Sequence, residues 1–288
     1  MPDTLIQCVI VLYKQSPWEA RSLSTLLGIC AQSPEIAGKI HIAVQDNSPE
    51  PPLAEFCPSI AGFTYFRAPN NPGLAVAYGR ALAMARDKKI PWLLTLDQDT
   101  VLVHDFLIQL LSALESDISQ QASAVVPELV HDNLVLSPQI VRAVFYHRIP
   151  LGFFGFAKEQ VVAFNSAACL NVEALTAIGG FPKEYWLDYL DHIVFYRLQS
   201  AGGRVYILNS QLKHNLSLQN LESEVSVERY SSILKGEWRY IRESRGSLGP
   251  LIHRIRLLKR AMGHALHLQN KRYSIQTLLA AIQGKPPQ

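Results

Sequence analysis

Strands and helices are predicted to alternate four times within the first hundred residues, and this alternation constrains the fold more than any other feature of the chain. The first run, residues 5–12, is β-branched and almost continuously apolar. Such a run is typical of a strand that is covered on both faces, as in a parallel sheet. Further strands are predicted at 39–44, 63–67 and 92–96. The pattern indicates βαβ units and an α/β fold whose central sheet is mostly parallel and flanked by helices.

The helices between these strands have recognisable ends. Ser16 is a good N-cap, Pro17 suits the first helical position and Glu19 completes a capping box, which predicts a helix to about residue 31. An alanine-rich helix is predicted to follow Gly73 and to run to about residue 88. Farther along, we expect a helix at 105–115, a strand at 124–130, an irregular stretch at 131–159, a strand at 161–170, a helix at 188–200 and a strand at 204–208.

Size and composition agree with one large domain that carries an appendage. The chain has 288 residues, of which 48% are hydrophobic and 18% charged, and this excludes general disorder. After residue 223 the pattern is helical to the end. We therefore predict a sheet-containing domain at 1–222 and a C-terminal helical extension at 223–288.

Charge, hydropathy and cysteine usage exclude several classes of protein. A net charge of +3 is too small to indicate a nucleic-acid partner. No apolar stretch reaches the length of about eighteen residues that a membrane span needs, and the N-terminus has no signal-peptide pattern. No cysteine belongs to a C-x-x-C pair, which favours a reducing compartment; the four are Cys8, Cys30, Cys57 and Cys169. We expect a cytoplasmic protein, soluble or peripheral on the inner face of the cytoplasmic membrane.

Polar side chains follow the ends of three predicted strands, at Tyr13, Asp46 and Asp97-Gln98-Asp99. These ends should meet at one edge of the sheet, where α/β folds bind ligands. The carboxylates of Asp97 and Asp99 suit Mg²⁺ or Mn²⁺ bound together with phosphate oxygens. The alternative is that they form a turn or an N-cap before the next helix. Two interpretations of Asp46 stay open: it accepts a hydrogen bond from a ribose or a base, or it forms an Asx turn. The chain has neither a G-x-G-x-x-G motif nor a P-loop.

Asp188 and Asp191 form a second pair of acids. Their i, i+3 spacing would place both on one face of the predicted helix. Trp186 precedes them, and acids beside aromatic rings could supply a general base. The alternative is that acids in the first turn of a helix simply favour its dipole.

A series of short motifs occurs in an order that resembles the family-2 inverting glycosyltransferases of the GT-A fold, which is Rossmann-like. The chain is most similar to their bacterial rhamnosyltransferase branch, which builds O-antigens and related polysaccharides. The resemblance covers about residues 5–245, and it rests on the order of the motifs because each is weak alone. The motifs are Val9 to Tyr13, Asp46-Asn47-Ser48, Asn70 to Ala75, Asp97-Gln98-Asp99, Phe164-Asn165-Ser166, Gly179-Gly180-Phe181, and Asp188 and Asp191 followed by Arg197.

The resemblance implies a nucleoside-diphosphate sugar donor, Mg²⁺ or Mn²⁺, and an acceptor hydroxyl. In this family's pattern Asp46 matches the acid that contacts the base, Asp97 the first acid of D-x-D and Asp99 the direct metal ligand. Asp191 matches the catalytic base, and the D-x-x-D spacing is that of rhamnosyltransferase-like members. The remaining implied site residues are Tyr13, Asn71, Gly73, Asn165 and Asp188 at the substrate and His214 at the metal.

The implied function is metal-dependent, inverting transfer of a sugar, with dTDP-rhamnose as the suggested donor, to a glycan or lipid-linked acceptor. Two departures leave the acceptor open, because His192 follows Asp191 and Ala167-Ala168 replaces a glycine that often follows Asn-Ser. One alternative is a sugar-nucleotide nucleotidyltransferase, although the chain lacks the Gly-rich basic N-terminal loop that this would need. The other is a non-catalytic glycan-binding or scaffold protein, against which the intact acids argue.

The C-terminal extension carries a basic amphipathic pattern. Apolar residues recur at helical spacing from Pro250, at Leu251, Ile255, Leu258, Met262 and Ala265, and most positions between them are basic. A helix of this kind can lie on an anionic membrane surface. The alternative is that it packs on the catalytic domain or on another subunit of a homo-oligomer.

Overall fold

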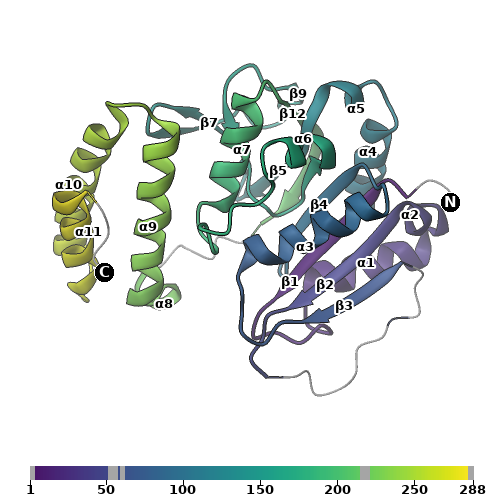
Figure 1. Ribbon diagram of the computed structural model, residues 1–288, viewed down its shortest axis with the longest axis horizontal. Coiled ribbons are helices and arrows are strands. Elements are labelled where there is room, and N and C mark those ends of the chain that lie inside the picture. The colour runs from purple at the N-terminus through teal and green to yellow at the C-terminus, as the bar shows by residue number, and fades with distance from the viewer. Residues whose placement is uncertain (1–3, 51–57, 59–61, 215–220, 285–288) are drawn as a thin grey trace.

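The structure, a computed structural model, describes residues 4–50, 58, 62–214 and 221–284 (Figure 1). A nine-stranded sheet with the order β3-β2-β1-β4-β11-β5-β12-β9 forms its centre, and β6 pairs with β5 beside this path. The pairs β3-β2, β2-β1, β1-β4 and β5-β12 are parallel, whereas β11 runs antiparallel to both β4 and β5. The strands are β1 (Ile6–Leu12), β2 (Ile40–Asp46), β3 (Phe63–Arg67), β4 (Trp92–Asp97), β5 (Ala122–His131), β6 (Leu134–Ser137), β9 (Gly155–Phe156), β11 (Ala168–Asn171) and β12 (Arg204–Lys213).

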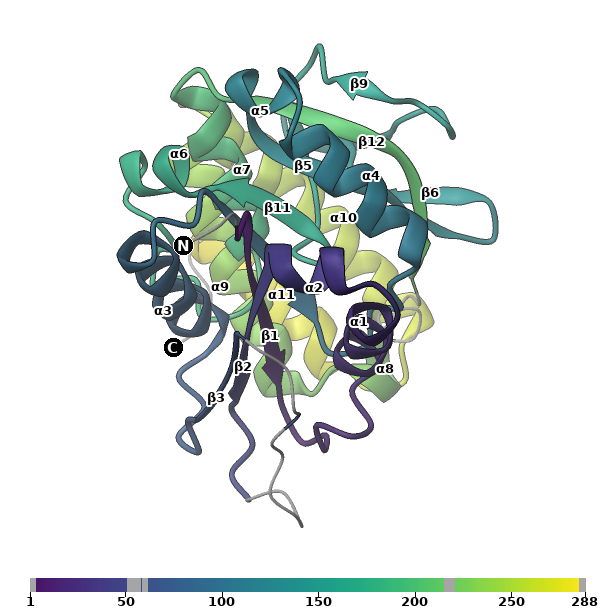
Figure 2. The ribbon, with the colours of Figure 1, turned by 90° about the vertical axis from the view of Figure 1, so that its right-hand side faces the viewer.

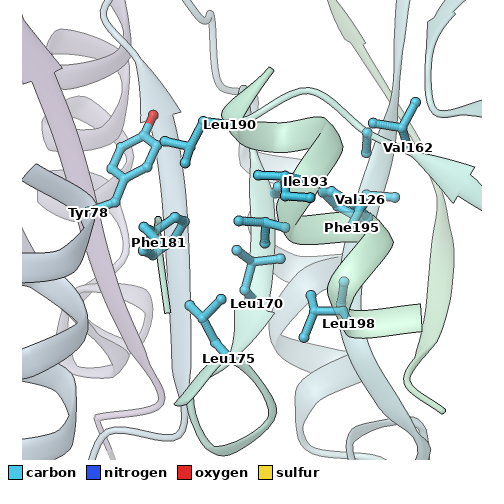
Figure 3. Packing of buried hydrophobic residues seen from close by; sticks show 14 of the residues in the cluster. Tyr78, Val126, Val162, Leu170, Leu175, Phe181, Leu190, Ile193, Phe195 and Leu198 are labelled. Atoms are coloured by element: carbon cyan, nitrogen blue, oxygen red, sulfur yellow. The ribbon is translucent and has the colours of Figure 1, made fainter. Parts of the chain in front are cut away.

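Helices cover both faces of this sheet, which confirms the predicted α/β class (Figures 1 and 2). On one face the buried cluster joins the strands to α3, α6 and α7, and Figure 3 shows Leu170 of β11 packed between α6 and α7. On the other face a separate buried cluster includes residues of α1, α2 and α4. These helices and the short α5 are α1 (Arg21–Gln32), α2 (Pro34–Lys39), α3 (Leu74–Asp87), α4 (His104–Leu114), α5 (Ile118–Gln121), α6 (Val172–Ala177) and α7 (Leu190–Ser200).

Five sequence-based predictions were wrong in their bounds or in the kind of element. The capping hydrogen bonds at Ser16 form, but Ala20 is extended (φ −67°, ψ 110°), so α1 begins only at Arg21. The predicted strand at 161–170 is broken, because Ala167 takes a left-handed φ of 67° and separates β10 (Val161–Val162) from β11. The stretch at 131–159 is not irregular. It contains β6, β9, β7 (Gln139–Arg142) and β8 (Phe145–Arg148), and β7 and β8 form a small antiparallel sheet with β10.

A fourth error concerns the acids. Asp188 is not helical, because Tyr189 has a φ of 66° and α7 begins at Leu190. The pair Asp188 and Asp191 therefore does not share one helical face as predicted. The last strand was also predicted too short, since β12 runs on to Lys213.

The C-terminal part is helical, as expected, and consists of α8 (Leu221–Glu224), α9 (Val227–Ser244), α10 (Gly249–His267) and α11 (Arg272–Gln283). These helices share a third buried cluster that includes Trp238 and Leu257. Helix α9 also reaches the main domain, because Tyr240 and Ile241 belong to the cluster that contains α7. No described helix is long and apolar enough to cross a membrane. Of the cysteines, Cys8, Cys30 and Cys169 are buried and free, and Cys57 lies outside the described residues.

A buried ion cluster holds α10 on α9. Both oxygens of Glu237, which is 1% exposed, accept hydrogen bonds from Arg260, at 2.7 and 2.8 Å. Arg256 lies 3.7 Å away, and the His253 ring lies 3.9 Å away. Burial alone would raise the pKa of Glu237, but the hydrogen bonds and charge of Arg260 bring it below its ordinary value. The carboxylate is therefore ionised and paired inside the helical extension.

Glu237→Gln should destabilise the helical extension by about 3–5 kcal/mol, because it leaves Arg260 as an uncompensated buried charge. Hydrogen exchange of α9 to α11 and urea unfolding measure this loss. The matched control is Glu35→Gln on the exposed side of α2, which should change stability by less than about 0.5 kcal/mol. Equal stability of the two variants would contradict the assigned role of the pair.

Candidate functional site

The largest predicted group of site residues lines one cleft at the carboxyl edge of the sheet. The cleft has a volume of about 760 Å³ and lies between the ends of β1, β2, β4 and β12 on one side and the first turns of α9 on the other. In Figure 1 these strand ends point toward the level of α8 and the start of α9. The predicted residues that line it are Tyr13, Asn71, Gly73, Asp97, Asp99 and His214.

The strand-end loops are tied to one another by hydrogen bonds. The Tyr13 amide donates to Gln98 Oε1 at 2.9 Å, and the Lys14 amide donates to Ser48 Oγ at 2.9 Å. The loops after β1, β2 and β4 therefore form one connected rim. This arrangement follows from parallel pairing, which sets Val11 beside Asp97.

Asp97 is a half-buried acid of the rim. Ser166 donates a hydrogen bond to Asp97 Oδ2 across 69 residues of sequence. Burial raises the pKa of the Asp97 carboxyl above its ordinary 3.8; the Ser166 hydrogen bond and His214 lower it, while Asp99 and Asp191 raise it. The fold thus brings Asp99, Asp191 and His214 close enough to affect the Asp97 carboxyl.

The loop before α3 fits against a segment far along the chain. Gly73 has a φ of 88°, and a Cβ there would lie 2.4 Å from the Trp186 ring, so only glycine fits without a shift. The Leu74 amide donates to the Trp186 carbonyl at 2.8 Å, and Trp186 Nε1 donates to the Asn71 carbonyl at 3.2 Å. Trp186 therefore forms part of the cleft wall together with the predicted Asn71 and Gly73.

Asp46 and Asn165 are held by hydrogen bonds at the edge of the site. Asp46 Oδ1 accepts from the Ser48 amide at 2.9 Å, which is the Asx-type contact, and Oδ2 accepts from Tyr65 Oη at 2.6 Å. Asn47, the next residue, lines the cleft. The Asn165 carbonyl accepts from Thr95 Oγ1 at 2.8 Å, which fixes the segment that carries Ser166. A direct substrate contact by either side chain stays a prediction.

The two later acids have different surroundings. Asp191 lies in the first turn of α7, and its Oδ1 accepts from both the backbone amide and Nδ1 of His192 at 2.7 Å. Asp188 lies in the loop before α7, with Oδ1 3.6 Å from Arg229 of α9. Burial raises the pKa of Asp188, Arg229 lowers it and Asp191 raises it. The D-x-x-D segment therefore bridges the main domain and α9.

His214 directly follows β12, and its backbone amide donates a hydrogen bond to the Val130 carbonyl at 3.0 Å. It lines the same cleft as Asp97 and Asp99. Among the described residues, no group of three or more His, Cys, Asp or Glu side chains is arranged to hold a metal by itself. The described chain could thus contribute only part of a coordination shell at this cleft.

Sequence reasoning missed the contribution of α9. Ser226, Glu228, Arg229 and Ser232 line the cleft. The N-cap of α9, Ser226, accepts from the Arg229 amide at 3.1 Å, and this capping pattern was the only local signal. Nothing local relates α9 to the strand ends, because the contact depends on tertiary packing.

An α/β sheet whose carboxyl edge carries an acidic cleft is the architecture of nucleotide-binding enzymes. Residues 8–152 match the family model of glycosyl transferase family 2, which is just over half of the chain. The chain therefore belongs to glycosyl transferase family 2. Comparison with curated protein sequences gives no match.

Solved glycosyltransferases of the GT-A type share the fold. S. aureus TarS superimposes with a TM-score of 0.59 at 13% identity, covering 97% of this chain and 49% of TarS, so the chain spans about half of that protein. TarS 1–349 in complex with UDP-GlcNAc gives 0.57 at 12% identity, covering 98% and 81%. Mannosyltransferase PcManGT from Pyrobaculum calidifontis, in complex with GDP-Man and Mn²⁺, gives 0.56 at 14% identity, covering 99% and 87%. Identities this low indicate the fold alone.

Asp97→Asn should stabilise the metal-free protein at neutral pH. Because the native-state pKa of Asp97 lies above its ordinary value, stability falls as the pH rises through that native pKa, and asparagine removes this cost. We expect the melting temperature at pH 7.5 to rise by about 2–4 °C. The difference should shrink as the pH falls toward the ordinary carboxyl pKa of 3.8, because a growing fraction of Asp97 is then protonated.

Thermal melts with a chelator between pH 3.5 and 8 measure this pH dependence. Asp87→Asn, on the exposed end of α3, is the matched control and should follow the wild type throughout. A lower melting temperature of Asp97→Asn at pH 7.5 would show that the ionised carboxylate stabilises the fold.

Proposed function

We propose that the chain is a metal-dependent inverting glycosyltransferase that moves a sugar from a nucleoside-diphosphate donor to a glycan or lipid-linked acceptor. The observation that carries the proposal is the cleft at the sheet edge, lined by Asp97, Asp99 and His214 with Asp191 close enough to affect Asp97. The motif order, above all the D-x-x-D segment, favours rhamnose from dTDP-rhamnose as the donor. Two solved structures that share the fold are complexes with UDP-GlcNAc and with GDP-Man, which supports a nucleotide-sugar donor of some kind.

The residues present fit a divalent ion that is shared with the donor. Carboxylate and imidazole suit Mn²⁺, and carboxylate suits Mg²⁺. Mg²⁺ is typically bound by one or two carboxylates together with substrate phosphates rather than by a complete protein cage. Asp99 and His214 would hold the ion, with Asp97 beside them. When bound, the ion would neutralise charge on the leaving diphosphate.

We assign Asp191 as the general base. His192 occupies Oδ1, and no described residue donates a hydrogen bond to Oδ2. We assign Oδ2 to the acceptor hydroxyl, whose proton it takes while the oxygen attacks the anomeric carbon. The bond from that carbon to the diphosphate oxygen breaks on the opposite side, and the electron pair leaves with the diphosphate. Arg229, which also lines the cleft, can bind the negative charge that develops there.

The catalytic domain is proposed as residues 1–222 and the extension as 223–288. This boundary falls within the short helix α8. Because the first turns of α9 line the cleft, we regard the extension as a functional part of the enzyme rather than a separate module. The enzyme is proposed to be cytoplasmic and to bind the inner face of the cytoplasmic membrane.

Asp191→Asn should lower the rate of sugar transfer by about 10²–10⁴-fold, because the amide cannot take the acceptor proton. Nucleotide binding should not change, since Asp191 contacts the acceptor in this scheme. Isothermal titration with dTDP-rhamnose, UDP-GlcNAc and GDP-Man, each with Mn²⁺ or Mg²⁺ and with a chelator, measures donor binding. Product analysis measures transfer.

Each part of the proposal can fail separately in these measurements. Full transfer by Asp191→Asn would exclude Asp191 as the base. Tighter binding of the uridine or guanosine donor than of dTDP-rhamnose would exclude rhamnose. Binding that survives the chelator unchanged would exclude metal dependence.

An apolar outer face on α10 and α11 supports membrane binding. Helix α10 packs inward through His253, Leu257 and Ala261, so the predicted apolar stripe points outward. Met262 is 68% exposed and Leu266 is 77% exposed. The outer face comprises Leu251, Ile255, Leu258, Met262 and Leu266 of α10 and Ile275, Leu278 and Ile282 of α11. The two helices form the end of the molecule beyond α9 (Figure 1).

Charge favours an anionic lipid surface over a second copy of the chain. After Glu243 the sequence has eight Lys and Arg residues and no acid. Because the whole chain has a net charge of +3, residues 1–243 carry a net charge of −5. Arg254 and Lys259 are exposed on either side of the α10 stripe. A two-fold dimer through this face would bring like charges together, whereas a bilayer would accept the apolar stripe and attract the flanking cations.

Ile255→Gln/Met262→Gln should reduce sedimentation with phosphatidylglycerol vesicles at least tenfold, because it removes two apolar anchors. Binding should weaken with added salt and on neutral phosphatidylcholine vesicles. Ile108→Gln on α4, where Ile108 is 47% exposed, is the matched control. A dimer in sedimentation velocity that the double variant dissolves would instead assign the face to a second copy.

A further inference from the structure

A second groove runs from the proposed donor cleft along α9. It has a volume of about 640 Å³ and lies between α9 and residues 184–188. Trp186, Leu187 and Ser232 line both the cleft and the groove, so the two are continuous. The groove therefore opens into the proposed donor cleft.

Three cations line this groove from one face of α9. Lys235, Arg239 and Arg242 are spaced i, i+4 and i+7, which places them in one row about 10 Å long. All three are exposed. Arg239 lies over the Tyr185 ring at 5.5 Å and Arg242 over the Trp238 ring at 5.4 Å, so aromatic contacts orient both guanidinium groups.

The carboxylates of the groove are directed elsewhere. Glu243 accepts a hydrogen bond from Arg197 at 2.6 Å, and Glu184 also acts on Arg197. Asp188 pairs with Arg229 at 3.6 Å. Arg239 and Arg242 donate to the backbone carbonyls of Glu184 and Gly284. Within the described chain, the three cations have no carboxylate within ion-pair distance.

The groove is held in place by a close backbone contact. Gly236 faces the loop before α7, and a Cβ there would lie 2.9 Å from the Asp188 carbonyl. Helix α9 therefore lies directly against the segment that carries Asp188, next to the proposed base. A ligand that moves along this groove toward the donor cleft passes the row of cations and then Trp186, which lines both.

We propose that this groove binds the acceptor and that the acceptor carries phosphate. Planar guanidinium groups bind phosphate oxygens through paired hydrogen bonds, and the lysine adds a point charge. The partly exposed Trp186 ring offers a surface for the acceptor sugar. Two sources share this chemistry: a lipid-linked sugar diphosphate and a polyol-phosphate polymer. The inference rests on the proposed function, because it assigns the second substrate of the same reaction.

Binding of defined probes tests the groove. The probes are geranyl-diphosphate N-acetylglucosamine, a glycerol-phosphate hexamer and neutral octyl N-acetylglucosaminide, each titrated with and without UDP and Mn²⁺. We expect at least one phosphate probe to bind about tenfold more tightly than the neutral glycoside, with an affinity that falls as salt is added. The preferred phosphate probe identifies the source.

Lys235→Gln should weaken that probe about tenfold, and Lys235→Gln/Arg239→Gln should weaken it further. Lys235 makes no hydrogen bond or ion pair with any described residue, so Lys235→Gln should not disturb the fold. The single variant therefore tests the groove even if the double variant unfolds. Arg86→Gln, exposed on α3, removes the same charge far from the groove and is the matched control. Equal affinities of the phosphate and neutral probes, or wild-type affinity in Lys235→Gln, would overturn the assignment.

The two substrates are judged by separate titrations. Absence of nucleotide binding by the wild-type protein would count against the proposed function. Binding of the phosphate probes, measured with and without nucleotide, tests the assignment of the groove separately.

Discussion

Burial of β1, β2 and β4 on both faces determines where this protein can carry out chemistry. Their side chains are almost completely enclosed between the two helical layers. A polar side chain inside these strands, such as Thr95, needs a hydrogen-bond partner, whereas polar side chains at the strand ends can face the cleft. The parallel register then brings Leu12 beside Asp46 and Val11 beside Asp97. The acidic rim is thus a direct consequence of packing the sheet from both sides.

The rim acquires its final form from segments far along the chain. The antiparallel strand β11 enters between β4 and β5, and Thr95 of β4 donates to the carbonyls of Asn165 and Ala168. This places Ser166 against Asp97. Trp186 reaches the rim in a similar way, by filling the space that Gly73 leaves without a side chain. The surroundings of Asp97 therefore depend on sequence-distant hydrogen bonds that a local motif does not contain.

This difference in range explains what the sequence could predict. The strands of the first half, α3 and the cleft position of Asp97 and Asp99 follow from local periodicity and from the rule for parallel sheets. The strands between residues 131 and 159 were missed because each is only two to four residues long, too short to show a period. The lining of the cleft by α9 was missed because it depends on the close approach at Gly236. The outward stripe of α10 was read correctly as apolar, but only the structure places it away from the core.

Helix α9 connects all the features that we assign to function. Its first turns line the donor cleft, its cationic row lines the proposed acceptor groove, and Glu237 on its other side holds α10 through Arg260. If the outer face of α10 and α11 rests on a membrane, the same helix sets how the groove meets that surface. A phosphate-bearing acceptor anchored in lipid would then approach along α9 toward Asp191. The family match ends at residue 152, before any of these elements, so acceptor choice would depend on the part of the chain that the family model does not cover.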